Sequence, residues 1–256
     1  MTVFLFKLFT TPTLILFATV ASRRFGQAIG GWLVGLPLTS GPIAVFLAVE
    51  NGARFARHAA LGSLEGTVAQ ACFATTYARL AQGSRWPISL LGSAVAFAIA
   101  GLLLMRFRLP MPLVVAIACA SLGAGLKLVG KPKTSAAPVS APKWDLPLRM
   151  VVATSLVLVV TSVANDLGPN LSGLAATFPL FAIVLVVFAH QQQGAAAVRG
   201  VMRGLMLGLY GVVGFFSAVS LLVARIGLAS AFAIALAVNL LIHGATLVVL
   251  RRGHGR

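Results

Sequence analysis

The side chain best suited to chemistry in this sequence is Glu65, a carboxylate within a long apolar stretch. Gly62 and Gly66 flank it, and Gln70 follows one helical turn later. Glycines at this spacing allow a neighbouring helix to approach closely. A carboxylate inside a membrane is costly enough that it usually serves a proton, a cation or a substrate. We therefore expect Glu65 to have such a role; the alternative is that it lies near the outer surface and pairs with an arginine or with water.

Two interrupted apolar stretches supply the other candidate binding groups. Residues 30–42 read GGWLVGLPLTSGP, and residues 171–183 read LSGLAATFPLFAI. Proline lacks an amide donor and clashes with the preceding helical turn. The backbone groups freed inside a membrane must then be satisfied by other helices, hydroxyl side chains, water or a ligand. Together with Glu65, we expect a substrate or ion site formed by Pro37, Thr39, Ser40, Gly41, Thr177 and Pro179. The alternative is a pair of kinks that only shape helix packing.

Polar residues at the ends of apolar stretches are candidate gates. Asn165 and Asp166 precede a Gly-Pro pair, and His190 precedes three glutamines. Solvated turns and interfacial helix ends are the alternatives for these three. Asn239 and His243 are four residues apart, and we expect them to form hydrogen bonds between helices. The sequence has no Ser/His/Asp set, phosphate-binding loop, carboxylate pair or metal-ligand spacing, so we expect neither an enzyme nor a bound metal or cofactor.

An internal repeat relates these groups to one another. Eleven residues between positions 22 and 68 recur 142 positions later without a gap, and six of the eleven are Gly or Pro. A bias toward Ala, Val and Leu does not explain matches of that kind. The matched pairs include Pro37 and Pro179, Gly52 and Gly194, Gly62 and Gly204, and Gly66 and Gly208. Repeated units with proline interruptions at matching positions are typical of secondary transporters.

The composition places the chain among helical membrane proteins. Hydrophobic residues make up 59% of it and charged residues 9%, whereas soluble domains carry about 25% charge. The mean hydropathy is +0.99. The net charge of +16 is spread over single or paired basic residues, without a basic helix face or an aromatic platform. We therefore expect no nucleic-acid partner.

A membrane-spanning helix needs roughly 20 mostly apolar residues, and nine stretches meet that requirement. They lie near residues 3–21, 31–50, 59–82, 87–106, 110–129, 148–164, 171–190, 201–224 and 228–250. The fifth has no counterpart in the repeat. The predicted fold is thus all-α and polytopic, with four helices in residues 1–107, a bridging helix and Pro-rich linker in 108–147, and four helices in 148–256.

The distribution of Lys and Arg predicts the orientation. Alternate loops carry fourteen basic residues on one side and six on the other. The positive-inside rule places the C-terminus in the cytoplasm and the N-terminus outside, in an inner membrane of bacterial type. An odd bridging helix then inverts the second half relative to the first. The expected partners are a small solute or ion, anionic lipid headgroups near the lysines of residues 131–147, and a second copy of the chain.

The second half of the sequence resembles the GlpM family of small four-helix inner-membrane proteins. The resemblance rests on the run from Leu171 to Ala182, followed by Ala189-His190 and Gly194. The family has a similar Gly-Leu-x-x-x-Phe-Pro-x-x-Ala stretch before a histidine near a helix end. The resemblance covers residues 148–250 and implies two fused units of this kind. The arrangement of helices also resembles drug/metabolite transporters, in architecture alone.

These observations favour a secondary transporter for a small solute, which would work by alternating access between inverted halves. The alternative is a non-transporting membrane component that scaffolds an envelope complex. Polar groups at the two breaks favour the first, and a dry, tightly packed centre would favour the second.

Overall fold

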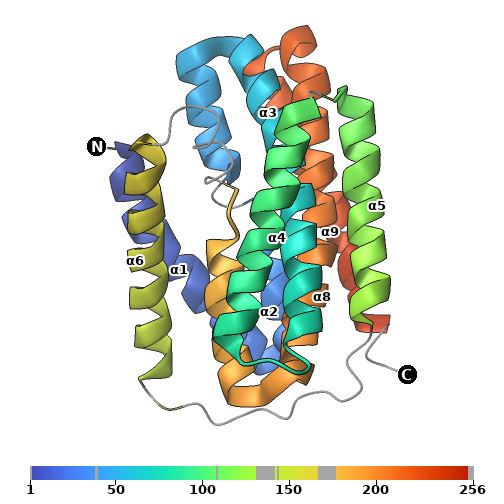
Figure 1. The fold of residues 1–256 in the computed structure, drawn as a ribbon. Coiled ribbons are helices and arrows are strands. Elements are labelled where there is room, and N and C mark those ends of the chain that lie inside the picture. The colour runs from blue at the N-terminus through green and yellow to red at the C-terminus, as the bar shows by residue number, and fades with distance from the viewer. Residues whose placement is uncertain are drawn as a thin grey trace.

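The computed structural model describes residues 2–37, 40–107, 109–130, 142, 144–166 and 177–252 (Figure 1). All regular structure within these ranges is α-helical. The helices are α1 (Thr2–Phe25), α2 (Gln27–Val34), α3 (Ser40–Leu80), α4 (Trp86–Phe107), α5 (Met111–Val129), α6 (Asp145–Asp166), α8 (Leu180–Ile226) and α9 (Leu228–Arg252). The prediction of an all-α fold is confirmed.

The described ranges form eight helices, where nine separate ones were expected. The difference arises because α3 and α8 each join one expected spanning stretch to part of the stretch before it, whereas the start of the expected span 31–50 belongs to the separate short helix α2. Gly52 within α3 has φ 82°, and Gly194 within α8 has φ 73°. Only glycine adopts such angles without strain, so a single residue makes the bend where the sequence suggested a loop. The chain reverses at both bends, near the top of Figure 1 for α3 and near the bottom for α8.

Four of the described helices, α4, α5, α8 and α9, are long and apolar enough to cross a membrane. Large apolar side chains point outward from α4 and α9. Leu91 is 69% exposed and Leu241 is 75% exposed, as suits contact with lipid rather than water. The chain thus has the character of a helical membrane protein. The kind of membrane and the sides on which its termini lie stay predictions.

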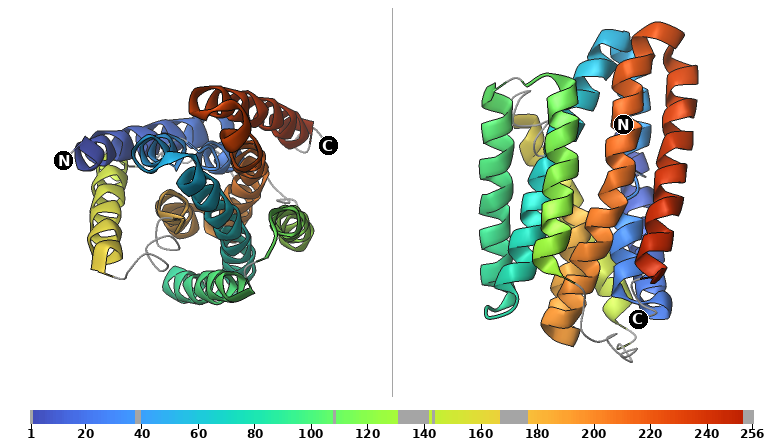
Figure 2. Two further views of the ribbon diagram at one scale, coloured as in Figure 1. Left: turned by 90° about the horizontal axis from the view of Figure 1, so that it is seen from above. Right: turned by 90° about the vertical axis from the view of Figure 1, so that its right-hand side faces the viewer.

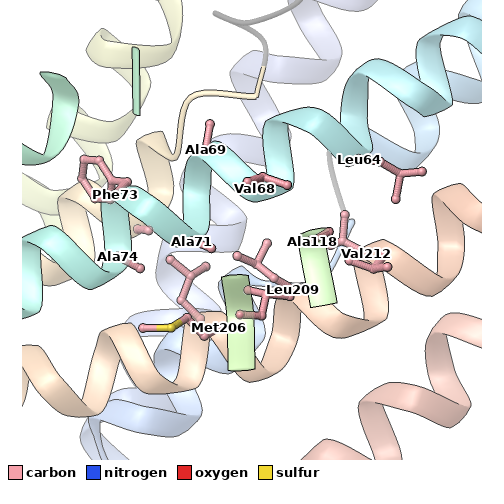
Figure 3. Packing of buried hydrophobic residues seen from close by; sticks show 14 of the residues in the cluster. Leu64, Val68, Ala69, Ala71, Phe73, Ala74, Ala118, Met206, Leu209 and Val212 are labelled. Carbon is pink, nitrogen blue, oxygen red and sulfur yellow. The ribbon is translucent and has the colours of Figure 1, made fainter. Parts of the chain in front are cut away.

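The central element is the long second arm of α8, which packs against α2, α3, α5 and α9 (Figure 2). Figure 3 shows the core where α3 and α5 meet this arm. Leu64 and Phe73 of α3, Ala118 of α5, and Met206 and Leu209 of α8 are almost fully buried there. Residues of both predicted halves therefore share one apolar core. Beside it, α1 and α6 pair with each other and contact α8.

Candidate functional site

The first break in the helices lies between α2 and α3, at the proline that the sequence indicated. After Val34, the amide of Gly35 donates to the carbonyl groups of Gly31 and Trp32, at 3.2 and 3.1 Å. Pro37 follows, and its carbonyl accepts a hydrogen bond of 2.8 Å from the amide of Gly41 in the first turn of α3. Pro37 therefore separates α2 from α3. Its carbonyl accepts a hydrogen bond in the first turn of α3, although proline has no amide hydrogen to donate.

The second break, before α8, is built in the same way. Thr177 and Phe178 are non-helical, and the carbonyl of Pro179 accepts a hydrogen bond of 2.9 Å from the amide of Ile183. Ile183 and Pro179 lie 142 residues after Gly41 and Pro37, so the two hydrogen bonds join corresponding positions of the repeat. The repeat seen in the sequence thus extends to the hydrogen bonding at each proline.

Each break packs against the long helix of the other half. Gly35 lies on Gly208 of α8, where an added Cβ would be 2.8 Å from the Cα of Gly35. Thr177 lies on Gly66 of α3, where an added Cβ would be 2.5 Å from the Cβ of Thr177. Small residues on both long helices permit this approach. Thr177 lies 142 residues after Gly35, and Gly208 lies 142 residues after Gly66. The two contacts therefore join corresponding positions of the repeat.

A side chain of the first half also satisfies a backbone group freed at the second break. The amide nitrogen of Gln70 donates a hydrogen bond of 2.7 Å to the carbonyl oxygen of Thr177. Gln70 is one turn from Gly66 on α3, so the close helix approach and this bond occur together. The requirement that freed carbonyls be satisfied inside the membrane is met here by the protein itself.

Glu65 is half-buried on α3, next to the glycine that contacts Thr177. It takes part in no salt bridge among the described residues, so its expected alternative, pairing with an arginine, is not observed there. At the first break, Ser40 begins α3 and is half-buried. An added Cβ on the buried Gly41 would lie 3.6 Å from the Cζ of Phe215.

The predicted site residues therefore divide between two neighbourhoods. Pro37, Ser40 and Gly41 belong to the first break, and Pro179 and Thr177 belong to the second. Gly66, the neighbour of Glu65, contacts Thr177 at the second break. Thr39 lies outside the described residues.

Of the three predicted gates, His190 is placed in detail. Its Nδ1 is 3.4 Å from the hydroxyl of the buried Tyr77, and the two rings meet edge to face. His190 also lines an open cavity of about 720 Å³, together with the bend at Gly194 and with Arg85 and Trp86 before and at the start of α4. Asn165 and Asp166 are the last residues of α6, and their side chains are outside the described part of the structure.

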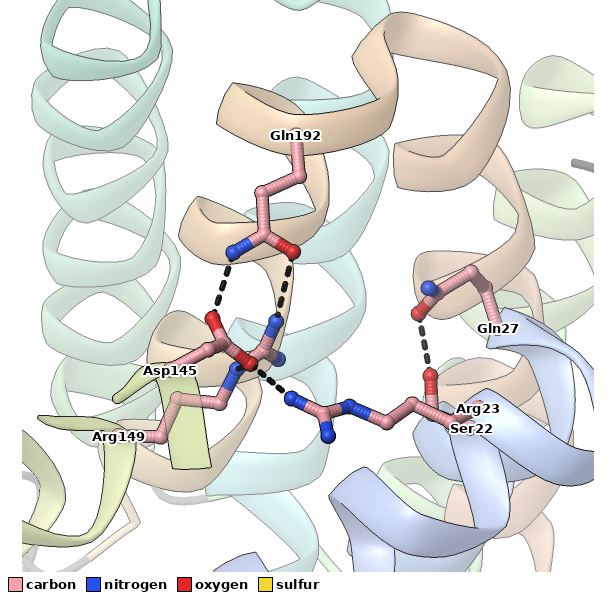
Figure 4. A network of polar contacts seen from close by, with 6 residues as sticks. All are labelled: Ser22, Arg23, Gln27, Asp145, Arg149 and Gln192. Carbon is pink, nitrogen blue, oxygen red and sulfur yellow. Dashed lines mark hydrogen bonds and ion pairs between the residues drawn. The ribbon is translucent and has the colours of Figure 1, made fainter. Parts of the chain in front are cut away.

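A charged cluster that the sequence did not reveal connects α1, α6 and α8 (Figure 4). Asp145 at the start of α6 is fully buried, and it accepts hydrogen bonds from Arg23 of α1 at 2.5 Å and from Arg149 at 2.9 Å. Gln192, two residues before the α8 bend, donates to the other carboxylate oxygen at 2.5 Å. The guanidinium of Arg149 also lies 4.6 Å from the ring of Phe188.

The electrostatics of this cluster favour an ionised Asp145. Burial raises the pKa of Asp145, but the hydrogen bond from Gln192, the charge and hydrogen bond of Arg149, and the hydrogen bond from Arg23 lower it more. The resulting pKa lies below the ordinary value of 3.8. Two guanidinium groups share one carboxylate, so the cluster carries a net positive charge.

From the sequence, Arg149 and Arg23 count only as positive charges in loops, and their pairing with Asp145 was not predicted. The signal that was available is the spacing of Asp145 and Arg149, because an acid four residues before a base at a helix start forms a pair on one face. The other partners are 122 and 47 residues away from Asp145 in sequence. No local pattern identifies them.

The hydrogen bonds between helices that we expected from Asn239 and His243 of α9 are not observed, because the Oδ1 of Asn239 and both ring nitrogens of His243 are buried without a hydrogen-bond partner among the described residues. Asn239 and His243 are buried, and the ring of His243 lies 4.8 Å from that of Trp32 in α2. The hydrogen bond between these two helices runs from Nε1 of Trp32 to the hydroxyl of Thr246, at 3.1 Å. Thr246 is a position that the sequence did not single out.

A second cavity, of about 400 Å³, lies between α1, α2 and the start of α8. Its lining includes Leu36 and Phe181, each within two residues of a break. Neither this cavity nor the one at His190 is lined by Glu65, Pro37 or Pro179.

The fold and these contacts define the class as an all-α membrane protein with two helix breaks. Comparison with protein-family models, with curated proteins and with solved structures gave no match to this chain. The resemblance to GlpM stays a prediction.

Proposed function

We propose that this chain is a secondary transporter that moves a small solute across a bacterial inner membrane. In this proposal the bends at Gly52 and Gly194 divide α3 and α8 into two crossings each, and the eight-residue α2 forms one crossing together with the first arm of α3, which gives nine crossings in all. The bends lie at opposite ends of the molecule, at positions related by the repeat offset (Figure 1). That placement supports inverted halves on either side of the bridging helix α5.

The observation that carries the proposal is the reciprocal contact of the two breaks. Gly35 lies on Gly208, and Thr177 lies on Gly66. A two-fold axis between the halves would produce such a pair of contacts, in which each residue is replaced by its counterpart in the repeat. Inverted-repeat transporters place their substrate where broken helices of the two halves converge, near the middle of the membrane.

The charged cluster supports a gate at the cytoplasmic end. Arg23 belongs to the first half, whereas Asp145, Arg149 and Gln192 belong to the second or its linker. Rocking one half against the other requires these ion pairs to break, because they cross between the halves. His190 borders the open cavity at this end, so a solute could approach the breaks past it. Glu65, beside the second break, is the candidate coupling group.

Transport is tested with purified protein in liposomes that contain a trapped pH-sensitive dye. A panel of amino acids, organic acids, amines and sugars is added outside, and proton movement is recorded for each. We expect at least one solute to drive proton flux, and the Glu65→Gln variant to lose that flux. Glu50→Gln is the matched control, since Glu50 is also on α3 but exposed near the bend.

A second candidate function is the scaffolding of an envelope complex. It is favoured by the close apolar packing of α3, α5 and α8 (Figure 3), and by the hydrogen bond from Gln70 that satisfies the carbonyl of Thr177 at the second break. Folded protein that moves no solute in the panel, and leaks no protons under an imposed gradient, would favour this function over transport.

A further inference from the structure

The cavity between α1 and α2 is a partly open groove with a mostly apolar lining. Leu14, Phe17 and Ala21 of α1 form one wall, and Leu33 of α2 contributes to the other. Phe17 is 64% exposed, so the groove is reached from the side of the bundle. Its volume of about 400 Å³ lies within the range of about 300–1,000 Å³ that is usual for small-molecule sites.

The length of the groove corresponds to one leaflet of a bilayer. Leu14 and Arg24 both line it and lie ten residues apart on α1. At 1.5 Å per residue, the helix between them spans about 15 Å, which is half of the roughly 30 Å hydrocarbon core. Arg24 is in the last turn of α1, where a headgroup would lie. An acyl chain that follows α1 from there reaches Leu36 and Phe181, beside the two breaks.

Two arginines, Arg23 and Arg24, make the end of the groove at the last turn of α1 positively charged. Arg23 is occupied by Asp145. Arg24 lines the groove, its guanidinium is 5.6 Å from the ring of Phe25, and it has no carboxylate partner among the described residues. A phosphate would complement this guanidinium, because arginine binds phosphate through charge-assisted hydrogen bonds.

We propose that the groove is a binding site for one anionic phospholipid, with an acyl chain along α1 and its phosphate on Arg24. The lipid belongs to the leaflet at the end where α1 finishes. It fills the gap between α1, α2 and α8, and so supports both helix breaks from outside. The site does not depend on transport, since its walls and charge are present whatever the chain moves.

The test is native mass spectrometry of the full chain in mild detergent, titrated with phosphatidylglycerol or phosphatidylcholine that carry identical dioleoyl chains. We expect tighter binding of one phosphatidylglycerol. Arg24→Gln should reduce that preference about fivefold, which corresponds to the roughly 1 kcal/mol expected for one juxtamembrane arginine. Arg252→Gln is the matched control, because Arg252 is also exposed in the last turn of a helix, α9.

A second variant tests the groove itself. Ala21→Trp fills it and should weaken both lipids, whereas Ala233→Trp on the exposed face of α9 should weaken neither. Equal binding of the two lipids, with no effect of Arg24→Gln, would overturn the proposal. If Arg24→Gln loses lipid binding but a folded Ala21→Trp protein binds lipid normally, the lipid is held by charge at the surface and not in the groove. A lipid-independent dimer that Ala21→Trp abolishes would assign the groove to a second copy of the chain.

Discussion

The close approach of α2 and α8 predicts opposite effects for one substitution at two positions related by the repeat. A Cβ on Gly204 would overlap the carbonyl oxygen of Ala28 and lie 2.8 Å from the backbone nitrogen of Trp32. Both obstacles are backbone atoms, which cannot rotate away. A Cβ on Gly62, the counterpart of Gly204, would have no atom within 4 Å.

The magnitudes follow from two terms. Replacing Gly by Ala within a helix stabilises it by about 1 kcal/mol, and overpacking a close contact costs about 1–3 kcal/mol. We expect Gly204→Ala to lower the free energy of unfolding by up to about 2 kcal/mol, and Gly62→Ala to raise it by up to about 1 kcal/mol. At about 2–4 °C per kcal/mol for a chain of this size, the two variants should differ by several degrees in melting temperature.

The assay is thermal unfolding in detergent, followed by the amount of monodisperse protein that survives heating. Wild type, Gly204→Ala and Gly62→Ala are compared in the same detergent. Equal melting temperatures for the two variants would refute the predicted packing of α2 on α8, as would greater stability of Gly204→Ala.

The charged cluster and α2 give three further predictions. Asp145→Asn leaves Arg149, which is 4% exposed, without its counter-ion and should destabilise the protein by about 3 kcal/mol, measured by the same thermal assay; an unchanged melting temperature would contradict it. Because the pKa of Asp145 is lowered from 3.8, its stabilising effect is fully present above pH 3.8 and is lost as the pH falls through the lower, folded value. The loss of stability between pH 5 and pH 2 should therefore be smaller in Asp145→Asn than in wild type, and equal losses would argue against the ion pair. Trp32→Phe removes the hydrogen bond to Thr246 and should cost about 1 kcal/mol, with no added effect when Thr246→Val is already present.

The sequence predicted most helices within a few residues, because long apolar stretches bounded by basic or helix-breaking residues leave little freedom. The expected spans at 87–106 and 110–129 correspond to Trp86–Phe107 and Met111–Val129. The breaks at Pro37 and Pro179 were also predictable, since proline disfavours a continuous helix, although Pro12 lies inside α1 without breaking it. The expected loop at 51–58 was wrong, because Gly52 alone makes the bend.

The candidate site was less predictable than the fold. Prolines indicate where a helix breaks, but not which helix fills the gap. The contacts of Thr177 with Gly66 and Gln70 join residues more than a hundred positions apart, and no local pattern specifies them. The repeat gave indirect information, because glycines kept at matching positions, such as Gly66 and Gly208, proved to be the surfaces on which the breaks pack.

The central claim is that the two halves are inverted, and labelling of the two bends tests it most directly. Single cysteines are introduced by Glu50→Cys beside the α3 bend and by Gln191→Cys beside the α8 bend, both exposed positions, after Cys72 and Cys119 are replaced by alanine. The cells are treated with a membrane-impermeant maleimide before and after permeabilisation. Inverted halves predict labelling of the Glu50→Cys variant in intact cells, and of the Gln191→Cys variant only after permeabilisation. Labelling of both variants from the same side would contradict the inversion.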